Sequence, residues 1–201
     1  MHQARIHNSM PTVIVVGGPA GTGKTTIAEL LSKHYECPFL EGDSLHPQAN
    51  VDKMSQGIAL TDDDRWGWLQ TLTEQASSKA ISNPNGHLCV VSCSMLKKMY
   101  RDYIKQTAER VATDAKTTVH FRFVFLHTTY EELLRRVNGR QGHYMKLDMV
   151  HSQYEIMQIP EGAELLKNGG EALEVDTTDK DPERIYNEIV VDLDKSHPQD
   201  D

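Results

Sequence analysis

The glycine-rich octapeptide GPAGTGKT at residues 18–25 constrains the fold of this chain more than any other feature. It matches the P-loop pattern G-x-x-x-x-G-K-[ST], in which a loop between a buried strand and a helix wraps a phosphate chain. Both neighbours fit, because the apolar run TVIVVG precedes it and Ile27, Leu30 and Leu31 recur behind it at helical spacing. The sequence therefore predicts a strand–loop–helix unit that binds a nucleoside triphosphate.

The residues of this loop have distinct chemical uses. Its glycines permit backbone conformations in which successive N–H groups point at phosphate oxygens. Lys24 would neutralise the β- and γ-phosphates, and the hydroxyl group of Thr25 would bind Mg²⁺. The residues predicted to bind ATP are Gly18, Pro19, Ala20, Gly21, Thr22, Gly23, Lys24, Thr25 and Thr26.

Five short apolar runs alternate with helical patterns along the chain. They lack clear period-two alternation, as expected for parallel strands that helices cover on both faces. Together with the P-loop, this order predicts a three-layer α/β P-loop fold, a five-stranded parallel sheet flanked by helices. The expected strands are residues 12–17, 37–42, 88–93, 121–127 and 172–176.

The length of 201 residues predicts one domain, which we place at residues 11–195. Residues 1–10 and 196–201 are polar and are expected to be disordered tails. The longest aliphatic run, residues 13–16, is far shorter than the roughly 20 residues of a membrane span. Residues 1–10 contain no apolar stretch that could serve as a signal peptide. A cytoplasmic protein without a membrane partner is expected.

The charge and the cysteines narrow the class of partner. With 29 acidic and 21 basic residues the net charge is −8, which argues against binding of nucleic acid. Cys37, Cys89 and Cys93 form no CxxC pair, so buried thiols are expected rather than a disulfide. A small-molecule substrate is the expected partner.

The polar stretch LEGDSLHPQAN, residues 40–50, begins where the second expected strand ends. Ligands of open α/β sheets bind at the carboxyl ends of strands, so Glu41 and Asp43 should face the P-loop. With Thr25 they are the predicted Mg²⁺ ligands. Asp43 could also accept or orient the proton of an attacking hydroxyl group, a catalytic role shared with Lys24, or it could cap the next helix.

Three further segments follow the P-loop: GDSLHPQANVDKMSQGIALTDDDRWGWL at 42–69, CSMLKKMYRD at 93–102 and RVNGRQGHYMK at 136–146. In this order they resemble the gluconokinase family of small P-loop sugar-acid kinases, over about residues 12–192. The resemblance implies ATP-dependent phosphorylation of D-gluconate at its 6-hydroxyl group, a shikimate-kinase-like fold with a mobile lid, and compatibility with a homodimer. Glu41 departs from the family, which often has Asp there.

A sugar acid needs a cation for its carboxylate. Arg65 follows an acidic cluster, whereas Lys97 and Arg101 lie four residues apart on one expected helix face. Guanidinium groups bind carboxylates through two parallel hydrogen bonds, which favours the arginines. Arg65 could instead pair with its acidic neighbours, and Lys97 could lie on a solvated face. His46 could bond a polyol hydroxyl group, a role strengthened by the resemblance, although a lone histidine is more often structural.

A lid is expected within about residues 136–160. Closing it would bring Arg136 and Arg140 to the transferring phosphoryl group, while simple capping of a helix end is the alternative interpretation. His143 in the same segment is a candidate for binding the acceptor. Related folds contact adenine near the position of Asp176 and Thr177, so these two residues are assigned to the nucleotide.

Two other classes stay open on the sequence alone. One is a kinase of another small acceptor, such as shikimate or a nucleoside monophosphate. The triple glycine expected of shikimate kinases after the third strand is replaced by Ser92-Cys93-Ser94. The other is a nucleotide-dependent regulatory module, which would need neither the carboxylate at the acceptor site nor the arginines of the lid.

Overall fold

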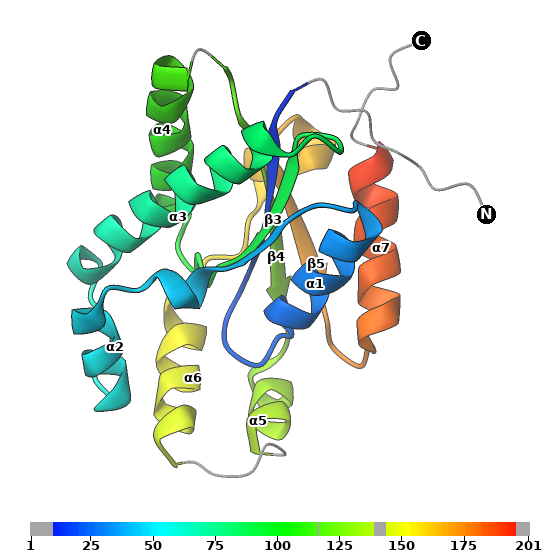
Figure 1. Ribbon diagram of the computed structural model, residues 1–201. Helices are drawn as coiled ribbons and strands as arrows, with labels where there is room; N and C mark the ends of the chain where they lie inside the picture. Colours follow the sequence, from blue (N-terminus) through cyan, green and yellow to red (C-terminus); the bar gives the residue numbers. More distant parts are fainter. Residues whose placement is uncertain (1–9, 116, 139–143, 196–201) are drawn as a thin grey trace.

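The computed structural model describes residues 10–115, 117–138 and 144–195, with side chains omitted at 113–115 and 144–146 (Figure 1). Apart from Met10, both expected tails lie outside these ranges, so their disorder stays a prediction. Within the described ranges, no helix is both long and apolar enough to cross a bilayer.

A five-stranded parallel sheet forms the centre of the molecule, in the order β2-β3-β1-β4-β5. The fold class and all five expected strands are confirmed. The strand expected at residues 37–42 is shorter, because Pro38 has no N–H group for pairing and Gly42 begins a 3₁₀ turn. The strands are β1 (Thr12–Gly17), β2 (Phe39–Glu41), β3 (Leu88–Ser92), β4 (His120–His127) and β5 (Ala172–Asp176).

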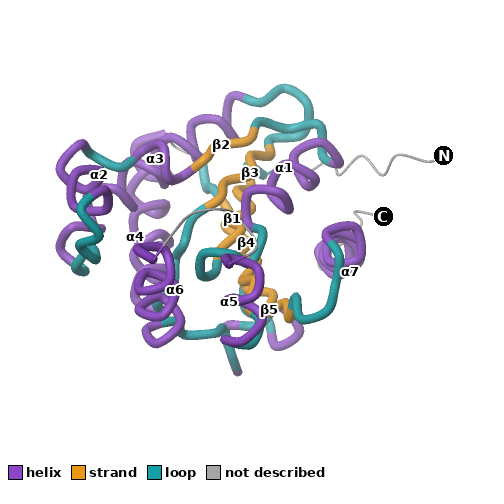
Figure 2. Tube along the Cα trace, turned by 90° about the horizontal axis from the view of Figure 1, so that it is seen from below, coloured by secondary structure: helices purple, strands orange, loops and turns teal. Residues whose placement is uncertain are grey.

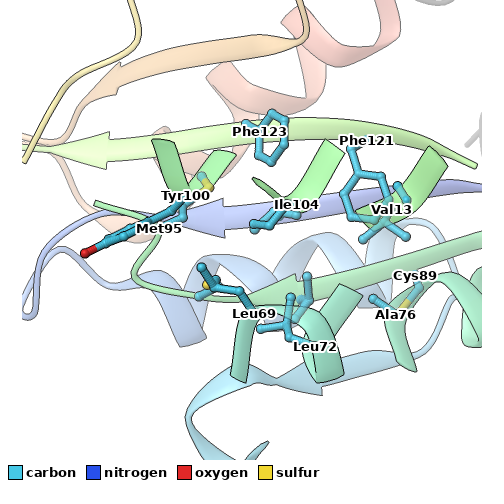
Figure 3. Packing of buried hydrophobic residues seen from close by; sticks show 14 of the residues in the cluster. Val13, Leu69, Leu72, Ala76, Cys89, Met95, Tyr100, Ile104, Phe121 and Phe123 are labelled. Carbon is cyan, nitrogen blue, oxygen red and sulfur yellow. The ribbon is translucent and has the colours of Figure 1, made fainter. Parts of the chain in front are cut away.

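Helices cover both faces of the sheet. Alternate residues of β1 point to opposite sides: Val13 and Val15 pack with α3 (Asp63–Ser82) and α4 (Lys98–Ala115), and Ile14 packs with α1 (Lys24–His34) and α7 (Pro182–Lys195). Figure 2 shows these two helical layers on either side of the strands. Figure 3 shows buried side chains of the core between the sheet and the helices α3 and α4. Burial on both faces explains why the strands read as continuous apolar runs.

Four helical segments gather beyond the carboxyl ends of the strands, in the lower part of Figure 1. They are the 3₁₀ turn η1 (Gly42–Leu45), α2 (Gln48–Ser55), α5 (Tyr130–Asn138) and α6 (Tyr144–Ile156). The turns η2 (Gly162–Glu164) and η3 (Leu166–Asn168) lead into β5. All three cysteines are buried free thiols, as the sequence predicted.

Candidate active site

The P-loop joins β1 to the first turn of α1. Gly18, Gly21 and Gly23 have φ angles of 129°, 88° and 89°, a region that side chains disfavour. A Cβ atom at Gly18 would lie 2.0 Å from the carbonyl oxygen of Leu126. The loop is therefore a backbone cradle at a helix N-terminus, which suits the phosphate chain of a nucleotide.

Lys24 and Thr25 extend this cradle toward the second strand. The ammonium group of Lys24 donates a hydrogen bond to the carbonyl oxygen of Pro19 at 3.1 Å. Burial lowers the pKa of Lys24, while Asp43, Cys93 and Glu41 oppose that shift. The lysine thus lies close to the carboxylates that end β2, as the strand-end argument predicted.

Glu41 faces Thr25 from the end of β2. The Thr25 hydroxyl group donates to Glu41 Oε2 at 2.8 Å, and Ser92 donates to the other carboxylate oxygen. These are hard oxygen donors at the mouth of the phosphate cradle, so the residues present fit a Mg²⁺ ion. The longer side chain of Glu41 reaches Thr25 even though the family often has Asp there.

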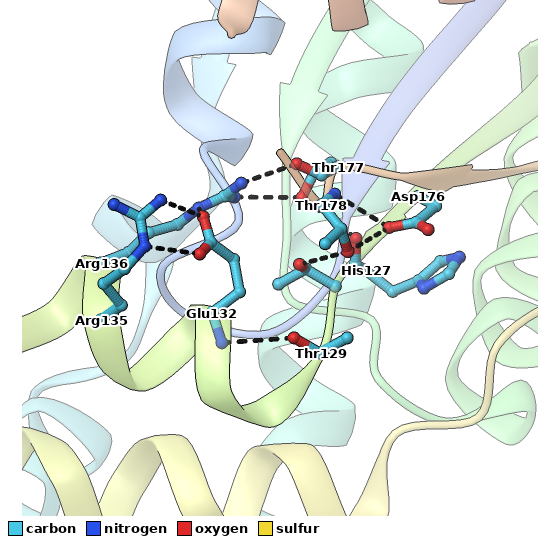
Figure 4. A network of polar contacts seen from close by, with 9 residues as sticks. His127, Thr129, Glu132, Arg135, Arg136, Asp176, Thr177 and Thr178 are labelled. Carbon is cyan, nitrogen blue, oxygen red and sulfur yellow. Dashed lines mark hydrogen bonds and ion pairs between the residues drawn. The ribbon is translucent and has the colours of Figure 1, made fainter. Parts of the chain in front are cut away.

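A cleft of about 450 Å³ lies beside the P-loop, with Thr26, Arg136 and Lys180 among its lining residues. Arg136 donates to the carbonyl oxygen of Thr177 at 2.6 Å, to its hydroxyl group at 3.0 Å and to Glu132 at 2.7 Å (Figure 4). Arg135 and Arg136 together lower the pKa of Glu132 to about 2. We call this space the nucleotide cleft. Arg136 is held in place by Glu132 of α5 and by Thr177, which follows β5.

The two residues assigned to adenine lie next to this network. Thr177 is fully buried and contacts Arg136. The Asp176 carboxylate accepts from the backbone and hydroxyl groups of Thr178, at 2.9 and 2.6 Å. Neither residue is among the described residues that line the nucleotide cleft, although Thr177 contacts Arg136, which does, and their contact with adenine stays a prediction.

A second cleft, of about 630 Å³, lies between the P-loop, α3 and α6, and we call it the acceptor cleft. It brings together residues from four segments of the sequence, all of them predicted: Lys24, Asp43, His46, Arg65 and Lys97. It also contains Asp62, Asp148, Ser152 and Gln153, which sequence reasoning did not assign. Gln153 accepts a hydrogen bond from the backbone N–H of Ala20 at 2.7 Å and so connects α6 to the P-loop.

Lys97 and Arg65, two of the cations that line the acceptor cleft, differ in their hydrogen bonding. Lys97 donates to both carboxylate oxygens of Asp62, at 2.7 and 2.9 Å, and Tyr100 also donates to Asp62. These bonds lower the pKa of Asp62. Arg65 is only 8% exposed, and its buried Nε has no hydrogen-bond partner within the described part of the chain. Its Nη2 donates to the carbonyl oxygen of Leu60 at 3.4 Å, so Arg65, unlike Lys97, has no carboxylate partner among the described residues and keeps a donor for a ligand.

Arg101 lies elsewhere. It is 1% exposed, and its guanidinium donates to Glu164 at 3.0 and 3.2 Å and to the carbonyl oxygen of Gln158 at 3.0 Å. The structure does not bring Arg101 into the described lining of the acceptor cleft, although its spacing from Lys97 suggested that it would. Its partners connect α4 to the segment that precedes β5. Arg140 and His143 lie outside the described residues.

Comparison with known proteins shows which family the chain belongs to. The family model described as "AAA domain" matches residues 14–158. The probable gluconokinase of Saccharomyces cerevisiae is 44% identical over 154 residues, which are 74% of this chain and 75% of the yeast protein. The chain belongs to the gluconokinase family.

Two further members of the family agree. The thermosensitive gluconokinase of Escherichia coli is 37% identical over 150 residues, covering 75% of this chain and 73% of its own length. The crystal structure of a gluconokinase from Sinorhizobium meliloti superposes with a TM-score of 0.73, at 34% identity, and covers 95% of this chain and 94% of its own. The resemblance read from the four sequence motifs is confirmed, together with the fold.

Proposed function

We propose that this chain is a gluconate kinase, which transfers the terminal phosphoryl group of ATP to the 6-hydroxyl group of D-gluconate to give 6-phosphogluconate and ADP. Membership of the gluconokinase family supports the activity. The observation that carries the proposal is that one cleft holds Lys24 of the P-loop, the Asp43 carboxylate and the guanidinium of Arg65, whose Nε has no partner among the described residues. Phosphate, hydroxyl and carboxylate groups of the two substrates each have a complementary partner there.

The nucleotide is bound by the backbone of the P-loop. The N–H groups of the loop would bind phosphate oxygens, and Lys24, which lines the acceptor cleft, would neutralise charge on the phosphates. The shift of Lys24 toward a lower pKa reflects burial, which two phosphate groups would offset on binding. Thr25 and Glu41 would hold Mg²⁺, which when bound neutralises charge on the phosphates.

The acceptor is oriented from three sides. Asp43 accepts the proton of the attacking hydroxyl group, a role worth about 10²–10⁴ in rate for a well-placed base. Arg65 binds the carboxylate at the other end of the substrate through charge-assisted hydrogen bonds. His46 contacts a hydroxyl group between these ends. The described part of α6 forms the remaining wall, and the closing of a lid over residues 136–160 stays a prediction.

A panel of acceptors tests this function. ADP release should be rapid with gluconate and close to the acceptor-free blank with shikimate, AMP or glucose. Equal rates with and without gluconate would contradict the proposal and would favour the nucleotide-dependent regulatory module. A cytoplasmic location and a homodimer also stay predictions, and the second is checked by light scattering.

A further inference from the structure

His46 is held rigidly in the acceptor cleft, between η1 and α2. Its ring stacks on the indole of Trp68, with centroids 4.0 Å apart and planes inclined by 18°. Trp68 is itself buried, and its Nε1–H donates to the carbonyl oxygen of Gly42 at 2.7 Å. Stacking on a fixed indole leaves the imidazole little freedom to turn.

Asn50, four residues further on, settles which ring nitrogen carries the proton. Its side chain is 3% exposed, and its amide nitrogen donates to the carbonyl oxygen of Asp64 at 2.8 Å. A peptide oxygen can only accept, so the atom that faces it must be the NH₂ group. The same nitrogen lies 3.2 Å from Nδ1 of His46. Its second proton points to Nδ1, which therefore accepts and carries no proton.

The proton of the neutral ring is consequently on Nε2. That atom has no hydrogen-bond partner among the residues that the structure describes, and the ring lines the acceptor cleft. Protonating Nδ1 would set two donors against each other. Burial lowers the pKa of His46. The charge of Arg65 lowers this pKa further, whereas the charge of Asp43 raises it. The other charged groups that line the cleft are Lys24, Asp62, Lys97 and Asp148.

We propose that Asn50 is a positioning residue, which holds His46 as the Nε2–H tautomer so that His46 donates a hydrogen bond to an acceptor hydroxyl group. This inference rests on the proposed function for the identity of the hydroxyl. The acceptor cleft then offers both kinds of hydrogen-bond partner, because the Asp43 carboxylate accepts hydrogen bonds and the His46 ring donates one. A protonated amino group cannot accept such a bond, so an amino-sugar acid with its ammonium at that position should be rejected.

Nitrogen NMR on the wild-type protein tests the tautomer directly. In ¹⁵N-histidine-labelled protein, long-range ¹H–¹⁵N correlations should show Nδ1 of His46 unprotonated and Nε2 protonated, with His46→Gln used only to assign the signals. A proton on Nδ1, or rapid exchange between both forms, would overturn the proposal. This measurement requires neither substrate turnover nor a folded Asn50 variant.

Kinetics of Asn50→Ala provide the second test, with Gln48→Ala as the matched control. Gln48 is exposed on the same helix, and its side chain donates a hydrogen bond to Asp52 at 2.8 Å. Asn50→Ala should mix the tautomers and raise KM for gluconate roughly three- to tenfold, the loss of one hydrogen bond, with KM for ATP unchanged. Gln48→Ala should change neither.

The two failures are distinguishable. If wild-type protein phosphorylates gluconate but Asn50→Ala keeps both the tautomer and KM, only the role of Asn50 is wrong. If wild-type protein does not phosphorylate gluconate, the proposed function fails whatever the tautomer of His46.

Discussion

Arg136 of the nucleotide cleft and Arg65 of the acceptor cleft differ in how far their guanidinium groups are hydrogen-bonded. In the nucleotide cleft Arg136 bonds to Glu132 and Thr177, and this network occupies its guanidinium in the structure. In the acceptor cleft Arg65 is buried with an unpartnered Nε, so far as the described residues show. An unsatisfied buried donor costs free energy, about 1–3 kcal/mol, unless a ligand supplies the acceptor. Arg136 therefore stabilises the framework of the nucleotide cleft, whereas Arg65 has a donor that a ligand can use.

The largest effect should come from Lys24, the P-loop lysine that lines the acceptor cleft. Lys24→Ala should reduce the rate of phosphoryl transfer roughly 10³-fold, because the transferring charge loses its main protein cation. The melting temperature should stay close to that of the wild type, since Lys24 makes one hydrogen bond to a loop carbonyl. Turnover near the wild-type rate would contradict a role of the P-loop lysine in phosphoryl transfer.

Asp43→Asn should have the next largest effect. It should separate catalysis in the acceptor cleft from binding of ATP in the nucleotide cleft. Loss of the base lowers kcat by about 10² or more, whereas the affinity for ATP changes little. Single-turnover rates and nucleotide titration measure the two quantities. Collapse of ATP binding would instead make Asp43 a metal ligand or a structural residue.

Arg65→Leu sharpens the comparison inside the acceptor cleft. Losing a charge-assisted bond of about 1.5–3 kcal/mol should lower kcat/KM for gluconate roughly ten- to hundredfold. Glucose has no carboxylate, so its rate should fall much less and the gluconate-to-glucose ratio should drop at least about tenfold.

Arg101→Leu is the contrasting variant. Because Arg101 is buried against Glu164 and Gln158, the variant should melt at a lower temperature and keep its gluconate-to-glucose ratio. A ratio unchanged by Arg65→Leu but reduced by Arg101→Leu would reverse the assignment.

The smallest effect concerns the framework of the nucleotide cleft. The pKa of Glu132 is lowered from 4.5 to about 2, so its ion pairs stabilise the fold above about pH 4.5 and are lost as the pH falls toward 2. Glu132→Gln should therefore be less stable than the wild type near neutral pH, with the difference shrinking over that window. Urea unfolding at several pH values measures it, with the exposed Glu131→Gln on the same helix as control. A constant difference would contradict the ion-pair origin.

Local patterns in the sequence determined the P-loop, the five strands and the position of Glu41 and Asp43. Each of these follows from contiguous residues: glycine conformations, apolar runs, and the rule that strand ends meet at one edge of a parallel sheet. The four motifs in order also identified the family, which the relatives confirm. Such features need no knowledge of which distant segments touch.

Contacts between distant segments were decided by the tertiary structure alone. The spacing of Lys97 and Arg101 predicts one helix face, yet Glu164, 63 residues away, pairs with Arg101, while Nε of Arg65 has no partner in the described part of the chain. In the sequence, Asn50 has the pattern of an ordinary helix residue. Only the structure shows that the carbonyl oxygen of Asp64 fixes the orientation of its amide group. The polarity of a hydrogen bond depends on every partner around it, and those partners are set by how the chain packs rather than by spacing along it.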